Sequence, residues 1–206
     1  DMCRSPFDNG LMNAIAELQP DMNVVAIVPS THNMLGGSAY KPGDILTAYN
    51  GKTIEVLNTD AEGRLILADA LAYASKQYDP EYMLDFATLT GAVVVTLGHI
   101  ATGLMSNNDT LVENIKVSSD NTGEHVWQLP LWEEYCDQVK SDVADVKNLG
   151  SPGQAGTIAG AAFLKAFVGK DIPWAHFDVA GTSYPVSYTH LRAHETPEHR
   201  VWRGVG

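Results

Sequence analysis

The sequence is poor in cysteine and in basic side chains. Its 206 residues contain only two cysteines, Cys3 and Cys136, too few for a disulfide framework in a chain of this length. Lysine and arginine number 13 against 25 aspartates and glutamates, which gives a formal net charge of -12. Nucleic-acid surfaces need clustered basic residues, so a nucleic-acid partner is not expected. The scarcity of cysteine favours a reducing compartment, and we expect a cytoplasmic protein.

Several other signals are absent. No apolar run approaches the length needed to span a bilayer, and no basic-then-apolar leader is found, so we expect no membrane association. The glycine-rich stretch 150–160 lacks the lysine of a phosphate loop, which argues against a nucleotide site. The chain begins at Asp1 rather than with methionine. We therefore expect a fragment or a processed chain.

The residues that are present predict one α/β domain. Hydrophobic residues make up 45% of the chain and charged residues 18%, which suffices for a sizeable core. Strand and helix patterns alternate, which predicts a three-layer α/β/α fold with a mostly parallel central sheet. We expect strands at 23–29, 83–89 and 174–181, helices at 11–18, 64–77, 132–139, 161–167 and from 111, and a hairpin of 45–49 with 52–56 around Asn50 and Gly51. The apolar segment after Gly91 fits either a helix or a strand.

Two carboxylates and a guanidinium fall close together in the octet 58–65, whose sequence is NTDAEGRL. The residues before it are strand-like and those after it follow helical spacing, so the octet is predicted to be a strand-to-helix junction. Asn58, Thr59 or Asp60 could cap the helix. Alternatively, Asp60 and Glu62 could coordinate a divalent cation, with an anion held on Arg64 beside it. The spacing alone leaves these alternatives open.

Polar residues also follow the predicted strands. Thr88 to Gly91 stand at the carboxyl end of one strand, where open α/β sheets bind ligands, although an ordinary turn fits the same residues. In the last strand His176 and Asp178 alternate with apolar residues, and we favour a structural role for both. His32 lies in a predicted loop without a partner at metal-ligand spacing, and we do not expect it to be a ligand.

The last part of the chain differs from the rest in amino-acid composition. Three of the seven histidines fall between His190 and His199, and His190 and His194 stand four apart, as metal ligands on a helix do. The stretch lacks an apolar face, however, and resembles the translated read-through of a sequencing adapter. We therefore predict a catalytic-type domain over 1–185 and a non-native, disordered tail over 186–206.

The octet resembles the signature of the leucyl aminopeptidase family of dimetal exopeptidases at all eight positions. The resemblance continues through residues 1–3, 37–44, 87–92 and 174–181, and it covers residues 1 to about 184. It implies two divalent ions, Zn, Mn or Mg. By this resemblance Asp60 binds the more exchangeable ion, Glu62 bridges both ions, and Asp1 holds the tighter one. Arg64 is the implied catalytic residue, because it positions a bicarbonate that acts as general base.

The same resemblance implies where the substrate lies. Thr88, Leu89 and Gly91 match family positions that line the pocket for the first side chain and engage the substrate backbone. Ala180 and Ser183 fall where the rest of that pocket lies. The implied function is a metal-dependent aminopeptidase that releases leucine-like apolar residues from peptides. The implied parent is a homo-hexamer.

The chain also departs from the family pattern. A metal-binding lysine, a second bridging aspartate and a catalytic lysine are expected before the position of Asp1, and this chain contains none of them. Residues 4–9 replace a small Gly-Ala-Ala segment, and the family's final helix is missing. We therefore expect an incomplete and inactive catalytic domain. The alternative is a catalytically silent relative that serves as a structural or interaction subunit.

Overall fold

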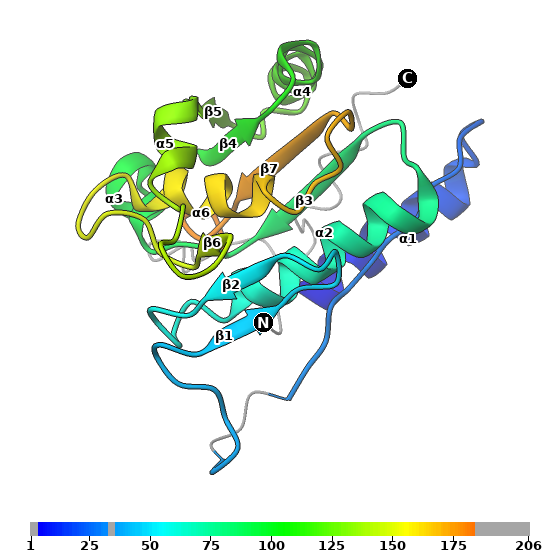
Figure 1. Ribbon diagram of the computed structural model, residues 1–206. Coiled ribbons are helices and arrows are strands. Elements are labelled where there is room, and N and C mark those ends of the chain that lie inside the picture. Colours follow the sequence, from blue (N-terminus) through cyan, green and yellow to red (C-terminus); the bar gives the residue numbers. More distant parts are fainter. Residues whose placement is uncertain (1–3, 33–35, 184–206) are drawn as a thin grey trace.

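The computed structural model describes residues 4–32 and 36–183 (Figure 1). Asp1 and the predicted tail 186–206 lie outside these residues. The helices are α1 (Arg4–Leu18), α2 (Gly63–Tyr78), α3 (Ala92–Leu97), α4 (Asp109–Thr122), α5 (Glu133–Asp137) and α6 (Gly156–Lys165). The strands are β1 (Ile45–Thr47), β2 (Thr53–Glu55), β3 (Met83–Ala87), β4 (Thr102–Ser106), β5 (Val126–Gln128), β6 (Val146–Lys147) and β7 (Trp174–Asp178). Within the described part of the chain, no helix is long and apolar enough to cross a membrane.

The larger sheet has the strand order β3-β7-β4-β5. β3 is parallel to β7 and β4 is parallel to β5, while β7 and β4 run antiparallel. Every residue of β7 is buried, as expected for a central strand covered on both faces. One core cluster packs β4 and β7 against α4, and the other packs the sheet against α2 and α6. The predicted three-layer, largely parallel α/β architecture is thus confirmed, with one antiparallel pair at its centre.

A second, smaller sheet with the order β1-β2-β6 was not expected from the sequence. β1 and β2 form the predicted hairpin, with Thr47 opposite Thr53. An Asn-Gly pair is typical of a two-residue turn in which both residues have a positive φ. Here only Gly51 has a positive φ, of 87°, so the turn is of another type. The Ala48 N–H donates to the Lys52 oxygen at 2.8 Å, which closes a three-residue loop. In such loops only the last residue needs the left-handed conformation.

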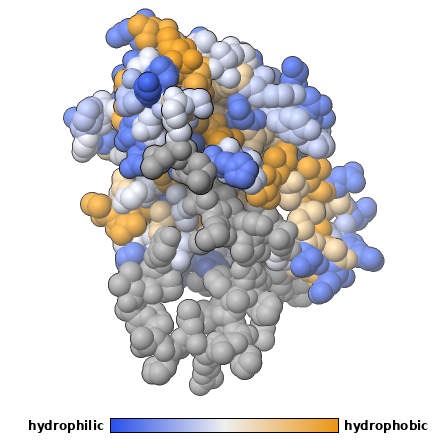
Figure 2. Space-filling model, turned by 90° about the horizontal axis from the view of Figure 1, so that it is seen from below, coloured by the Kyte–Doolittle hydropathy of each residue, from blue (hydrophilic) through white to orange (hydrophobic). Residues whose placement is uncertain are grey.

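The predicted strand at 23–29 is wrong. This segment forms no ladder in the described part of the chain, and Val25 and Val28 are 52% and 42% exposed. A β-branched run forms a strand only where a neighbouring strand accepts its hydrogen bonds, and no described strand does so. Figure 2 shows the molecule from below, where hydrophobic residues, coloured orange, lie exposed among hydrophilic ones.

The other boundaries shift in ways that local chemistry explains. α1 begins seven residues before the predicted start at Leu11 and includes Pro6, which its first turn tolerates. The undecided segment after Gly91 is the short helix α3. α5 covers only part of the predicted helix 132–139. α6 begins within the glycine-rich stretch, and eight of its ten residues are buried against the sheet and α2.

Candidate active site

The octet joins β2 to α2, as predicted. Glu62 is the N-cap residue of α2, but it has helical dihedral angles and makes no side-chain cap hydrogen bond. Asn58 Oδ1 instead accepts from the Asp60 N–H at 2.9 Å, which forms a local turn before the helix. The helix-cap interpretation of Asn58, Thr59 and Asp60 is therefore wrong, because this turn separates them from the first helical N–H groups. Among the described residues, no hydrogen bond or ion pair engages the carboxylates of Asp60 and Glu62.

Asn148 anchors the octet and was missed by sequence reasoning. It follows β6, is fully buried, and lies opposite the end of β2. Its Oδ1 accepts from the N–H groups of Leu57 at 2.8 Å and Asn58 at 3.3 Å. Its Nδ2 donates to the Asn58 oxygen at 2.7 Å. One side chain thus fixes the backbone that leads into the two carboxylates.

Arg64 lies in the first turn of α2 and is only 8% exposed. Its Nη1 donates to the backbone oxygen of Asn148 at 2.9 Å. Burial lowers the pKa of the Arg64 guanidinium, while the nearby charges of Asp178 and Glu62 act in the opposite direction. No described carboxylate lies within ion-pair distance of Arg64. Arg64 is therefore a buried cation without an ion-pair partner among the described residues.

Gly160 of α6 is the point where Arg64 meets the loop after β3. A Cβ at Gly160 would lie 3.0 Å from Leu89 Cδ2, 3.2 Å from Thr90 Cγ2 and 3.7 Å from Arg64 Nη2. The absence of a side chain on this helix face lets the three groups come together. The structure thus brings the predicted catalytic residue next to part of the predicted substrate-binding loop.

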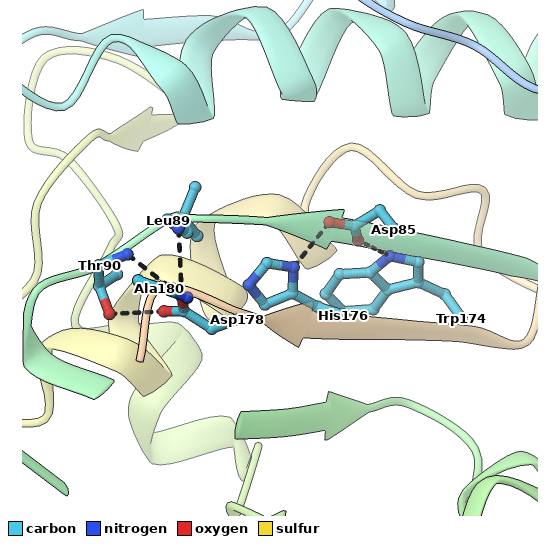
Figure 3. A network of polar contacts seen from close by, with 7 residues as sticks. All are labelled: Asp85, Leu89, Thr90, Trp174, His176, Asp178 and Ala180. Carbon is cyan, nitrogen blue, oxygen red and sulfur yellow. Dashed lines mark hydrogen bonds and ion pairs between the residues drawn. The ribbon is translucent and has the colours of Figure 1, made fainter. Parts of the chain in front are cut away.

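Two loops follow the carboxyl ends of the parallel strands β3 and β7. We call residues 88–91 and 179–183 the strand-end loops. Asp178, the last residue of β7, is fully buried and accepts hydrogen bonds from both loops (Figure 3). Its Oδ1 accepts from the N–H groups of Leu89 at 3.1 Å, Thr90 at 3.4 Å and Ala180 at 3.2 Å. Its Oδ2 accepts from the Thr90 hydroxyl at 2.6 Å.

A second buried cluster lies further back on the same strands. Asp85 accepts from Trp174 Nε1 at 2.7 Å and lies 2.6 Å from His176 Nδ1. His176 is fully buried, and its Nε2 has no hydrogen-bond partner among the described residues. These contacts support the expected structural role of His176 and place it away from solvent.

The remaining predicted site residues differ in how exposed they are. Gly91 is exposed and precedes α3, and Thr88 is half-buried. Ser183 is exposed, and its N–H donates to the Val179 oxygen at 2.9 Å. Asp1 lies outside the described residues. The predicted substrate-binding residues therefore all belong to the strand-end loops.

The described residues do not form a complete metal site. No group of three or more His, Cys, Asp or Glu side chains suitable for a metal ion occurs within 4–32 and 36–183. Asp60 and Glu62 offer oxygen ligands of the kind that divalent cations accept, and neither is engaged by another described side chain. The two carboxylates therefore fit part of a metal centre.

A hollow of about 340 Å³ is lined in part by Glu62. Its lining also includes Tyr40, His32 and Asp69, but not Asp60, Arg64 or any residue of the strand-end loops. Burial and the charge of Glu62 raise the pKa of Tyr40. Of the predicted site residues, only Glu62 borders this hollow, which therefore lies apart from Arg64 and the strand-end loops.

The candidate residues lie at the carboxyl ends of parallel strands, where α/β enzymes bind their substrates. The chain matches the structure of a mutant of tomato leucine aminopeptidase with a TM-score of 0.74 and 45% sequence identity, over 82% of this chain and 33% of that one. The model of the cytosol aminopeptidase family, catalytic domain, matches residues 1–201. The chain belongs to the cytosol aminopeptidase family.

Curated relatives agree with this assignment. The chain is 56% identical over 184 residues to a probable cytosol aminopeptidase of Desulfotalea psychrophila, covering 89% of this chain and 36% of that protein. It is 52% identical over 184 residues to a probable cytosol aminopeptidase of Cenarchaeum symbiosum, covering 89% of this chain and 38% of that protein. The chain thus spans little more than a third of the length of these relatives.

Proposed function

We propose that this chain is part of a metal-dependent aminopeptidase that releases leucine-like apolar residues from the N-termini of peptides. Family membership supports the peptidase activity. The meeting of Arg64 with Leu89 and Thr90 at Gly160 carries the assignment of the site, because it joins the octet to the strand-end loops. These segments lie far apart in sequence, and one reaction centre would use both.

Asp60 and Glu62 would hold two divalent ions, Zn, Mn or Mg, together with Asp1. Such a pair of ions, when bound, lowers the pKa of a water molecule and polarises the scissile carbonyl. The carboxylates suit this role because no described side chain competes for their oxygens. By family resemblance a metal-binding lysine, a second bridging aspartate and a catalytic lysine would complete the site.

Arg64 would hold a bicarbonate that accepts a proton from the attacking water. Arginine remains charged at neutral pH even when burial lowers its pKa, and its planar guanidinium matches a planar anion. In the described part of the chain only Nη1 makes a hydrogen bond, to Asn148, and that bond fixes the orientation of the guanidinium.

The strand-end loops would receive the substrate. Leu89 and Ala180 offer apolar side chains for the first residue of the peptide, while Thr88, Gly91 and Ser183 offer polar groups or open backbone. A pocket of this composition favours a leucine-like side chain over a charged one. By family resemblance the complete protein would act in the cytoplasm as a homo-hexamer.

Replacing Glu62 tests this function in the full-length protein. Glu62→Gln keeps the size of the side chain but removes the charge that would bridge two cations. We expect metal-dependent hydrolysis of leucine amide to fall at least about 100-fold. The circular dichroism spectrum and melting temperature of the metal-free protein should stay unchanged.

Glu81→Gln is the matched control, because Glu81 is exposed and precedes β3 at the opposite end from the strand-end loops. It should leave turnover unchanged. Undiminished turnover in Glu62→Gln would overturn the role of Glu62. A folded wild-type protein without any hydrolysis at saturating Zn, Mn or Mg would favour a catalytically silent relative.

A further inference from the structure

Asp178 joins the two strand-end loops through a single carboxylate. Two of its bonds come from Leu89 and Thr90 N–H groups in the first loop, a third comes from the Thr90 hydroxyl, and a fourth comes from the Ala180 N–H in the second. Figure 3 shows Leu89, Thr90 and Ala180 close around the carboxylate of Asp178. The residues predicted to contact substrate lie on these same two loops.

The Thr90 hydroxyl extends this connection to two helices. It lies 3.1 Å from the hydroxyl of Thr157 on α6, and it accepts from the Val93 N–H of α3 at 3.3 Å. Since its one proton is directed to Asp178 at 2.6 Å, the Thr157 hydroxyl donates to Thr90. Asp178 thereby ties the first strand-end loop to the helices α3 and α6 as well as to β7.

The burial of Asp178 makes these bonds difficult to break. Its side chain is fully buried, and no cation of the described residues forms an ion pair with it. The backbone N–H groups and the hydroxyl therefore replace its solvation by water. If either loop moved away, a buried carboxylate would lose donors that nothing else replaces. The position of the loops is thus coupled to the most deeply buried acid of the sheet.

We propose that Asp178 is a positioning residue that fixes the shape of the pocket for the first side chain of the substrate. It does not contact the substrate but acts through Leu89, Thr90 and Ala180. This inference rests on the proposed aminopeptidase function. Asp178 would thus influence which side chain the pocket accepts, although it lies behind the residues that line the pocket.

The test measures selectivity in the full-length protein. Asp178→Asn keeps the shape of the side chain but removes its charge and turns an amide group toward one set of donors. We expect KM for leucyl-p-nitroanilide to rise and the ratio of kcat/KM for leucyl over alanyl substrate to fall about tenfold, since the fit of a few methylenes is worth that much. If the substitution only reduced the fraction of correctly folded enzyme, the ratio would stay at its wild-type value, because both substrates would be affected equally.

Thr90 provides a second pair of variants, which leave the Asp178 side chain itself unchanged. Thr90→Val removes the hydroxyl at nearly constant shape and should lower the same ratio in the same direction. Thr90→Ser retains the hydroxyl and should restore the wild-type ratio. If Asp178→Asn does not fold, the two Thr90 variants test the positioning role in its place.

Asp85→Asn is the matched control. Asp85 is a buried acid on the neighbouring strand, and it contacts Trp174 and His176 rather than either loop. Its replacement should lower the melting temperature but leave the leucyl-to-alanyl ratio unchanged. A wild-type ratio in Asp178→Asn, or in Thr90→Val, would overturn the positioning role.

Hydrogen exchange separates this proposal from the proposed function. In Asp178→Asn, amides within 88–91 and 179–183 should exchange at least about tenfold faster, while those of α4 keep their wild-type rates. If the full-length wild type hydrolyses no aminoacyl substrate, the proposed function fails while exchange still measures the loops. Unchanged exchange in both loops would contradict the role of Asp178 whatever the enzyme does.

Discussion

Asn148 satisfies three backbone groups of residues 57 and 58 with one side chain. Replacing it with alanine would remove three hydrogen bonds and leave a cavity where the fully buried Asn148 side chain stood. We expect Asn148→Ala to lower the free energy of unfolding by about 2–4 kcal/mol, because each lost hydrogen bond costs about 1 kcal/mol and the cavity adds to this cost. Urea denaturation followed by circular dichroism measures this change.

The same substitution at an exposed asparagine provides the comparison. Asn121 lies on the exposed surface of α4, and Asn121→Ala should change stability by less than about 0.5 kcal/mol. Equal effects at both positions would show that Asn148 does not hold the octet. In the full-length protein, Asn148→Ala should also weaken Zn binding in a titration, since the backbone before Asp60 loses its anchor.

Residue chemistry explains why the sequence pointed to some of these side chains and not to others. Asp60, Glu62 and Arg64 stand out because they fall within five positions of one another. Asn148 is separated from its partners by about 90 positions, in a stretch without a motif. Asp178 is visible as an acid in an apolar strand, but only the fold reveals that its partners come from two loops.

At the scale of secondary-structure elements, the small residues of α6 decide how closely the helix approaches the site. Gly160→Ala would place a Cβ 3.0 Å from Leu89 and 3.2 Å from the methyl group of Thr90. The Leu89 side chain can rotate, but Thr90 is held by Asp178 and Thr157. Crowding therefore exceeds the gain of about 1 kcal/mol in helix propensity.

We expect Gly160→Ala to lower the free energy of unfolding by about 1 kcal/mol and to reduce turnover in the full-length protein, because Leu89 and Arg64 are pushed apart. Thermal denaturation and leucine amide hydrolysis measure the two effects. Gly63→Ala, at the start of α2, is the control for stability, since a Cβ there meets nothing within 4 Å. A more stable Gly160→Ala protein would show that Thr90 yields to the new methyl group.

Elements were predictable where their signals are local. The hairpin of β1 and β2 and the helix α2 follow from a turn glycine and an apolar period, and both are found. The strand at 23–29 could not be judged locally, because its composition favours a strand while strand formation needs a partner elsewhere. The small sheet was missed for a related reason, since β6 is only two residues long and pairs with β2 across about 90 positions.

At the scale of the whole molecule, the described chain leaves backbone and apolar surface uncovered. β3 is an edge strand whose only described partner is β7, and its Leu84 is 41% exposed. The segment 23–29 adds Val25 and Val28 without a ladder. Unpaired extended segments of this composition recruit further strands. The chain also spans only 36% of the length of its Desulfotalea psychrophila relative.

We therefore expect the isolated 206-residue chain to associate with itself, and a double substitution to reduce this association. Val25→Lys with Val28→Lys places two charges on the uncovered segment, which opposes the pairing of one chain with another. Size-exclusion chromatography with light scattering over a range of concentrations measures the effect. Val117→Lys with Val143→Lys is the matched control, because these valines are 59% and 65% exposed on α4 and in a loop. Both double variants reduce the net negative charge equally, so an equal loss of association in both would attribute it to charge rather than to the segment 23–29.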